Sequence, residues 1–153
     1  MAKHILPILI MAFIVSACTS TSPTCELPRA VPSEETTIVI YRPDAFYGIL
    51  YSTPFAINGC RVKDVSNNSY HVYKLPAGTH QIAAEKKIYA SGGDADIIGE
   101  FEKGKTYYLH YAMTPGDFYS VGGVSGFTTS TNFAVVSKEF AYKTMPKLEE
   151  DKI

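Results

Sequence analysis

The sequence predicts an all-β fold, an antiparallel β-sandwich of about seven to eight short strands. Short runs rich in β-branched and aromatic residues recur from residue 36 onward, and residues typical of turns separate them. No long helical period follows the first 17 residues. The composition, 46% hydrophobic and 19% charged, is that of a folded globular domain. We therefore expect one domain over residues 36–146, followed by a charged tail over 147–153.

The N-terminal segment has the pattern of a secretory signal peptide. A short basic start is followed by the run from Ile5 to Ala17, which carries no charge. This run is too short to span a bilayer comfortably, since a spanning helix needs about 20 apolar residues. Small residues at its end are typical of signal cleavage. Residues 1–17 are therefore predicted to be removed.

The stretch Val15-Ser16-Ala17-Cys18 resembles the lipobox of bacterial lipoproteins. The resemblance implies that Cys18 becomes the first residue and is acylated, with palmitate among the attached chains. Two or three acyl chains make such an anchor effectively permanent, because each buried methylene contributes about 0.8 kcal/mol. Thr19 stands where an Asp would imply retention at the inner membrane, which implies a lipid-anchored position in the outer membrane. The alternative is an ordinary signal peptide with a chance cysteine.

Residues 18–35 read as a flexible linker between the lipid and the domain, because Ser, Thr and Pro dominate and no apolar period is present. Its contour length would keep the domain within a few tens of Å of the membrane. Cys25 lies in this linker and Cys60 in the domain. An oxidising periplasm permits a disulfide between them. The alternative is that Cys60 packs as a small buried hydrophobe.

The first two predicted strand regions are the clearest. Residues 36–42, "TTIVIYR", form a β-branched run expected to be buried on both faces. Residues 54–62, "PFAINGCRV", predict a hairpin with a type I′ turn at Asn58-Gly59, where both positions tolerate positive φ. This turn places Ile57 opposite Cys60 on the buried face.

Further strands are expected along the rest of the chain. Residues 69–87 predict two strands joined at Pro76 to Gly78, and a tight turn there would place Tyr70 and Val72 on the same face as His80 and Ile82. Residues 95–101 alternate with Ala95, Ile97, Gly99 and Phe101 inward, and 106–113 are rich in aromatics that suit a strand. A last strand is predicted over 132–140.

Residues 114–133 stand out as a glycine-rich, nearly uncharged stretch, which predicts a long surface loop. Structureless loops of this length are uncommon in compact domains and are often functional. The candidate binding residues are its aromatics, Phe118, Tyr119 and Phe127, as anchors for a partner, a glycan or the membrane interface. The alternative is a hairpin with bulges whose aromatics complete the core.

The order of these motifs is similar to an uncharacterised domain-of-unknown-function family of small bacterial lipoproteins. The segments that carry the resemblance are "IVIYRP", "INGCRV", "NSYHVYKLPAGTH" and "EKGKTYYLHY", over Thr36 to Met113. That family resembles PEGA-type β-sandwich modules, which implies an extracytoplasmic role in binding or spacing rather than catalysis. The chain departs from the pattern after Met113. A fold alone does not specify a function.

No motif in the sequence predicts catalysis, a metal site or a cofactor. The histidines of the mature chain, His71, His80 and His110, lack the spacing of zinc ligands. His71 and His80 are expected on neighbouring strands with opposite orientations, and His80 as a hydrogen-bonded structural residue beside the turn. A net charge of −1 provides no basic field for nucleic acid.

These observations favour a non-catalytic binding or assembly module of the cell envelope, a lipoprotein of the outer membrane. Its expected partners are the membrane, through lipid on Cys18, and an envelope protein. The alternative is a binder of peptidoglycan or another glycan, or an inhibitor of a cell-wall hydrolase. An enzyme with a site assembled in space ranks last.

Overall fold

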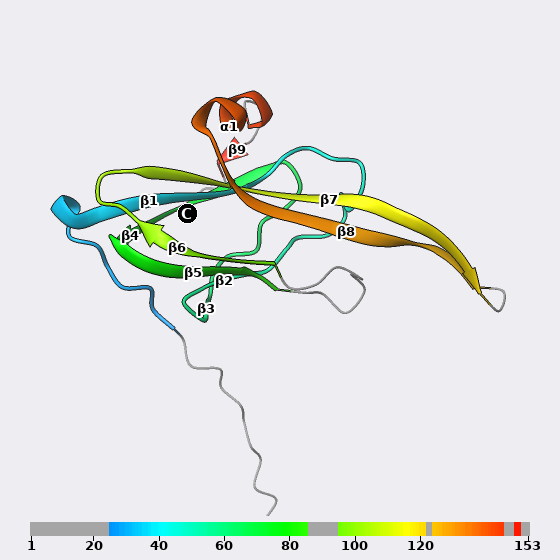
Figure 1. Cartoon of the computed structure of the whole chain (residues 1–153), viewed down its shortest axis with the longest axis horizontal. Coiled ribbons are helices and arrows are strands. Elements are labelled where there is room, and N and C mark those ends of the chain that lie inside the picture. Colours follow the sequence, from blue (N-terminus) through cyan, green and yellow to red (C-terminus); the bar gives the residue numbers. More distant parts are fainter. Residues whose placement is uncertain (1–24, 86–94, 122–123, 146–148, 151–153) are drawn as a thin grey trace, which may run out of the picture.

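The protein is a β-sandwich in the computed structural model, which describes residues 25–85, 95–121, 124–145 and 149–150. Within these residues, nine strands form a five-stranded sheet of order β8-β7-β1-β4-β9 and a four-stranded sheet of order β3-β2-β5-β6 (Figure 1). The strands are β1 (Glu35–Arg42), β2 (Phe55–Ile57), β3 (Cys60–Arg61), β4 (Ser69–Pro76), β5 (Gly78–Ala84), β6 (Ala95–Phe101), β7 (Thr106–Val121), β8 (Val124–Val136) and β9 (Glu149–Glu150). A 3-10 turn, η1 (Pro32–Glu34), precedes them, and one helix, α1 (Lys138–Thr144), follows β8. The predicted all-β sandwich is confirmed.

Strand β1 is the central strand of the five-stranded sheet and is buried on both faces, as its β-branched sequence predicts. Ile38 and Ile40 point into the core between the sheets. On the opposite face Tyr41 is covered by α1, where its hydroxyl lies 2.9 Å from Thr144 Oγ1. β1 pairs antiparallel with β4 and parallel with β7, so this sheet is mixed.

The predicted hairpin at Asn58-Gly59 is confirmed. Asn58 has φ 52° and Gly59 has φ 76°, the two positive values that a type I′ turn requires. Ile57 pairs with Cys60 across the turn, as expected. Both side chains are buried.

Strands β4 and β5 are joined at Pro76 to Gly78 as predicted, but they lie in different sheets, so the expectation that they are neighbouring strands is wrong. β4 pairs with β1 in one sheet and β5 pairs with β2 and β6 in the other. The chain crosses between the sheets at Gly78, whose φ is 141°. The buried residues of β4 include His71 and Leu75, whereas Tyr70 is only partly buried. Burying Leu75 fixes the inward positions, because strand residues alternate between the two faces.

The core lies between the two sheets and includes Phe55, Phe101 and Tyr111. The alternation predicted for β6 is confirmed, since its odd-numbered residues are less exposed than its even-numbered ones. Gly104, at φ 70°, makes the turn from β6 into β7. No helix among the described residues is long and apolar enough to cross a membrane.

Residues 114–121 and 124–133 belong to the two strands of a β-hairpin, which was the alternative to the expected loop. β7 and β8 pair from Tyr108 opposite Val136 to Val121 opposite Val124, with one register shift between Pro115 and Phe118. The outer part of this hairpin, residues 114–121 and 124–133, is called the arm, and it extends beyond the other strands (Figure 1). The Thr-rich sequence of β8 favours an extended backbone, which outweighs the presence of glycine.

The strand predicted over 132–140 extends too far toward the C-terminus, because β8 ends at Val136. The Ser137 side chain accepts a hydrogen bond from the Phe140 amide at 3.2 Å, which is an N-cap. The cap starts α1, which packs over β7 and β1 with Phe140 against His110. A serine before Lys138-Glu139 is a helix-start signal that the strand prediction overlooked.

Candidate binding surface

The residues predicted to serve as anchors lie in different parts of the molecule. Cys18 lies outside the described residues, so its lipidation stays a prediction.

Cys25 and Cys60 are joined by a disulfide, with Cα atoms 5.2 Å apart. That distance lies within the usual range for disulfides. Leu27, two residues after Cys25, packs against the hydrophobic core. The chain therefore contacts the domain from Cys25 onward.

The candidate anchors of the 114–133 stretch lie on the arm. Phe118 is 61% exposed and pairs with position 127 across the hairpin. Tyr119 pairs with Gly126. For Tyr119 and Phe127 the structure describes the backbone positions alone. The arm thus presents at least one large aromatic side chain to solvent.

The three histidines lie apart and have structural contacts. His80 Nε2 lies 2.7 Å from the Pro76 carbonyl oxygen, and its Nδ1 lies 2.9 Å from Asn58 Nδ2. His71 is buried, with Nε2 3.1 Å from the Asp64 carbonyl oxygen. The expected structural role of His80 is confirmed, although the two histidines lie in different sheets rather than on neighbouring strands.

His110 packs between the rings of Tyr41 and Phe140, and burial there lowers its pKa. Among the described residues, no three His, Cys, Asp or Glu side chains converge as metal ligands.

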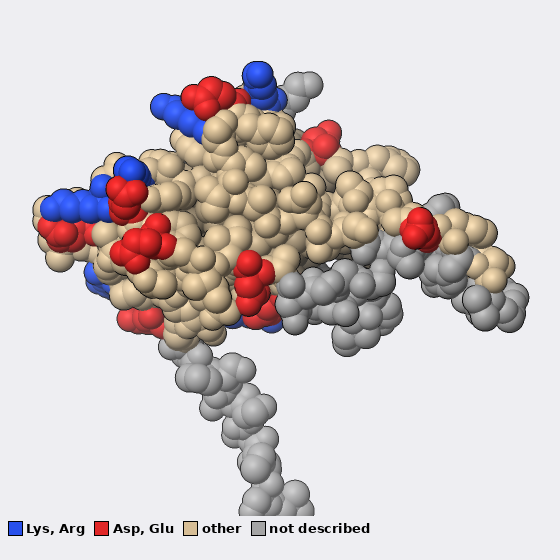
Figure 2. Space-filling view, in the orientation of Figure 1, with Lys and Arg blue, Asp and Glu red and all other residues tan. Residues whose placement is uncertain are grey.

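The most exposed apolar side chains belong to a segment that the sequence prediction passed over. Residues 43–52 connect β1 to the β2 region, and we call this segment the apolar loop. Phe46 is 93% exposed, Leu50 87%, Tyr51 55% and Ile49 52%. Figure 2 shows that charged side chains gather at the other end of the sandwich and over α1. Contiguous exposed apolar groups of this kind mark interaction sites.

Arg42, the last residue of β1, holds the apolar loop in place. Its side chain is 1% exposed and is the largest of the fully buried ones. Nη1 donates to the Tyr51 carbonyl at 2.5 Å, and Nη2 donates to the carbonyls of Gly48 at 2.7 Å and Tyr47 at 3.5 Å. The guanidinium thus forms hydrogen bonds with three backbone carbonyls of the loop. Arg suits this role because its donors form a rigid planar fork.

The environment of Arg42 is unusual for a buried charge. No carboxylate pairs with it among the described side chains, and its Nε has no hydrogen-bond partner there. Burial lowers the pKa of the guanidinium, which nevertheless stays protonated, because an arginine cannot be deprotonated in a protein. The hydrogen bonds to the loop carbonyls offset the free-energy cost of burying the charge away from water.

Gly48 is the residue that lets the loop close over Arg42. Its φ is +76°, and a Cβ built there would lie 2.8 Å from Arg42 Nη2 and 3.3 Å from Met113 Sδ. The loop backbone therefore lies against both the guanidinium and β7. Only glycine combines this positive φ with such a close approach.

The base of the loop is held by polar contacts. Asn67 Nδ2 donates to Asp44 Oδ1 at 2.9 Å, and the Ala45 amide donates to Asn67 Oδ1 at 3.2 Å. Thr53 pairs with Val65 as an isolated bridge. The arrangement is a fixed loop that presents apolar side chains, and it can bind a surface but offers no reactive group.

A sequence signal for this surface exists. The run from Ala45 to Tyr51 is apolar and aromatic and lies between Pro43 and Pro54. It has no strand alternation and is too short for a typical helix. An apolar segment that fits no buried element is a candidate for an exposed binding segment. The role of Arg42 had no such signal, because an arginine at the end of an apolar strand usually faces solvent.

Comparison with known proteins identifies a family for most of the chain. A family model described as "Protein of unknown function (DUF2846)" matches residues 32–124, which include β1 to β7, the apolar loop and Arg42. No curated protein and no solved structure is significantly similar to the chain. Since the matched residues make up more than half of the chain, the protein belongs to the DUF2846 family.

Proposed function

We propose that the protein is a non-catalytic binding module of the bacterial cell envelope, an outer-membrane lipoprotein that docks a partner protein through the apolar loop. The observation that carries this proposal is the exposure of Phe46 and Leu50 on a loop whose backbone is fixed by Arg42. A preformed loop loses little conformational entropy on binding, which favours affinity. Aromatic and aliphatic anchors of this type dominate binding energy at protein interfaces.

The N-terminal sequence supports the envelope part of the proposal. The uncharged run that ends at Cys18 has the lipobox pattern, and Thr19 does not signal retention at the inner membrane. A disulfide between Cys25 and Cys60 suits an oxidising compartment such as the periplasm. The sandwich architecture is in keeping with a relation to PEGA-type modules, which we include in the proposal.

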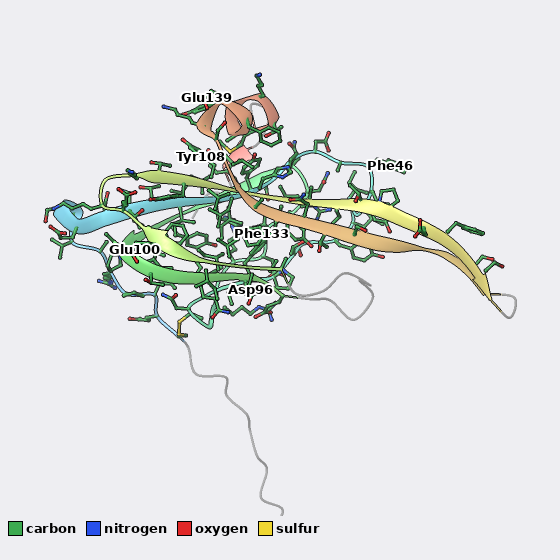
Figure 3. The ribbon with its side chains drawn as sticks, in the orientation of Figure 1. Phe46, Asp96, Glu100, Tyr108, Phe133 and Glu139 are labelled. Atoms are coloured by element: carbon green, nitrogen blue, oxygen red, sulfur yellow. A yellow bond between two sulfur atoms is a disulfide. The ribbon has the colours of Figure 1, made fainter. Side chains whose placement is uncertain are left out.

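The position of the apolar loop favours a protein partner over the bilayer that would hold the lipid. Phe46 lies at the opposite end of the domain from the disulfide (Figure 3). Only the short segment between Cys18 and Cys25 would separate the lipid from that disulfide, a reach of about 25 Å at full extension. The lipid would therefore hold the disulfide end near the membrane and direct the apolar loop away from it. The surface that meets the loop is expected to be apolar and uncharged.

Site-specific photocrosslinking in living cells tests the proposal. A photoreactive amino acid at position 46 is expected to trap one envelope protein, and Leu50→Asp is expected to abolish that product because it places a charge in the contact. The matched control is position 98 on β6, where Ile98 is also exposed, at 69%, but lies outside the loop. A crosslinker there is expected to leave the same partner uncaptured.

Other outcomes would overturn the proposal. The same product from positions 46 and 98 would mean that the apolar loop is not the contact. No product from position 46, together with sedimentation of the protein with isolated cell-wall sacculi, would favour glycan binding instead. If Cys18→Ser leaves the protein membrane-bound and of mature size, the lipid anchor is wrong, whatever the loop binds.

A further inference from the structure

Strand β8 is the outer edge of the five-stranded sheet. It pairs with β7 on one side and with no other strand among the described residues. The edge runs for 13 residues, from Val124 to Val136. An edge strand presents a row of backbone N–H and C=O groups that can pair with another chain.

The other three sheet edges are very short or carry charged residues, whereas β8 is long and uncharged. β9 consists of Glu149 and Glu150, β3 has two residues of which one is Arg61, and β6 carries Asp96 and Glu100. β8 contains no charged residue and no proline. Natural proteins protect edges by charge, proline or short length. Among the described residues, a long edge without charge, proline or a neighbouring strand on its outer side therefore indicates that another strand can pair with it.

The sequence of β8 matches its own reverse around Ser130. Antiparallel pairing about this residue places Thr131 opposite Thr129, Phe133 opposite Phe127, and Val136 opposite Val124. Asn132 meets Thr128 and Ala134 meets Gly126, so one pair of the register, Val135 with Ser125, joins dissimilar residues. Cross-strand aromatic, β-branched and Thr–Thr pairs are favourable combinations in sheets.

We propose that two copies of the chain pair through β8, antiparallel, around a two-fold axis at Ser130. The two five-stranded sheets then join into one continuous sheet. Such an interface is isologous, so it closes after two copies and does not propagate into a fibre. The absence of charge on β8 removes the like-charge repulsion that self-pairing would otherwise create.

Exposure along the β8 edge supports this assignment. Val135 is 48% exposed, although its cross-strand neighbour Leu109 is fully buried on the same face. Phe133 of β8 contacts the rings of Phe55 and Tyr111 between the sheets (Figure 3). In the proposed register the strand of the second copy lies beside these residues and covers the open side of the core.

Cysteine substitution on the two-fold axis tests the register. In the full chain, Ser130→Cys places two thiols opposite each other with Cα atoms about 4.5 to 5.5 Å apart, close enough for a disulfide. The matched control is Thr114→Cys. Thr114 pairs with Ser130 from β7, is also exposed, and lies one strand further from the second copy. Non-reducing electrophoresis is expected to show a dimer of this chain for Ser130→Cys, well above the level for Thr114→Cys.

A second pair of variants tests dimerisation without new cysteines. The mass of the full chain in mild detergent, measured by sedimentation equilibrium, is expected to be that of a dimer. Ser130→Lys places two like charges opposite each other and is expected to shift the mass to the monomer, whereas Thr114→Lys retains the dimer. A monomeric wild type, equal crosslinking of the two cysteine variants, or crosslinking of Ser130→Cys to a different protein would each overturn the proposal. None of these results depends on the partner of the apolar loop.

Discussion

The two ends of the sandwich each hold a segment that is not part of a sheet, but by different means. At one end a disulfide joins Cys25 to Cys60 in β3. At the other end Arg42 holds the apolar loop by hydrogen bonds to three carbonyls. The covalent link restrains the chain that enters the domain. The polar link shapes the surface that we propose binds a partner.

The two restraints are expected to act on different states of the chain. A disulfide acts mainly by limiting the unfolded chain, so its loss leaves the folded contacts largely in place. A buried guanidinium acts in the folded state, because the loop carbonyls depend on it for donors. We therefore expect loss of Arg42 to disturb the apolar loop directly, and loss of the disulfide to leave that loop unchanged.

Replacement of Arg42 should have the largest effect. In Arg42→Met the carbonyls of Gly48 and Tyr51 lose their donors, which should lower the free energy of unfolding by about 3 to 5 kcal/mol. Amide exchange in residues 43–52 should become faster, and crosslinking from position 46 should be lost. Urea denaturation and hydrogen exchange measure these effects.

The matched control is another arginine. Arg61 has a side chain that is 63% exposed and forms an ion pair with Asp64 at 3.3 Å. Exposed ion pairs contribute little, so Arg61→Met should change the free energy of unfolding by less than about 1 kcal/mol. Similar losses in the two variants would show that Arg42 does not hold the loop.

Removal of the disulfide should have the next largest effect and a different pattern. Cys25 and Cys60 are 35 residues apart in sequence, for which loop entropy predicts a loss of about 2 to 4 kcal/mol in Cys25→Ser. Cys60 would remain as a small buried thiol. A reducing agent should lower the denaturation midpoint of the wild type and leave that of Cys25→Ser unchanged. Loss of the position 46 crosslink in this variant would contradict the distinction between the two ends.

The parts of the fold that depend on local rules were predictable from sequence. The hairpin at Asn58-Gly59 follows from turn geometry, and β6 follows from alternation. The chain crossing at Gly78 was not predictable, because tight turns join strands within one sheet as readily as between two. The sequence left open whether residues 114–133 form a loop or a hairpin, because the choice depends on pairing between β7 and β8.

The candidate binding surface was predictable only in part. Phe118 was predicted as a binding residue because it lies in a glycine-rich, nearly uncharged stretch, and it is exposed on the arm. The apolar loop was passed over because periodicity identifies buried faces and gives no signal for apolar groups that remain in solvent. Arg42 was not identified because its partners are backbone carbonyls, which every residue possesses and which no side-chain motif reveals.

The smallest expected effect, at Gly48, gives the sharpest test of the polar restraint. Gly48 and Gly59 share φ +76°, but a Cβ at Gly59 would meet no atom within 4 Å, whereas one at Gly48 would lie 2.8 Å from Arg42 Nη2. Gly59→Ala should therefore lower the free energy of unfolding by about 1 kcal/mol, the cost of the positive φ alone. Gly48→Ala should lower it by about 2 kcal/mol or more, because the Cβ also meets the guanidinium. In the Arg42→Met background the excess at Gly48 should largely disappear, which a double-mutant cycle measures. An excess that persists without the guanidinium would assign it to Met113, and the loop would then be shaped by packing on β7 rather than by Arg42.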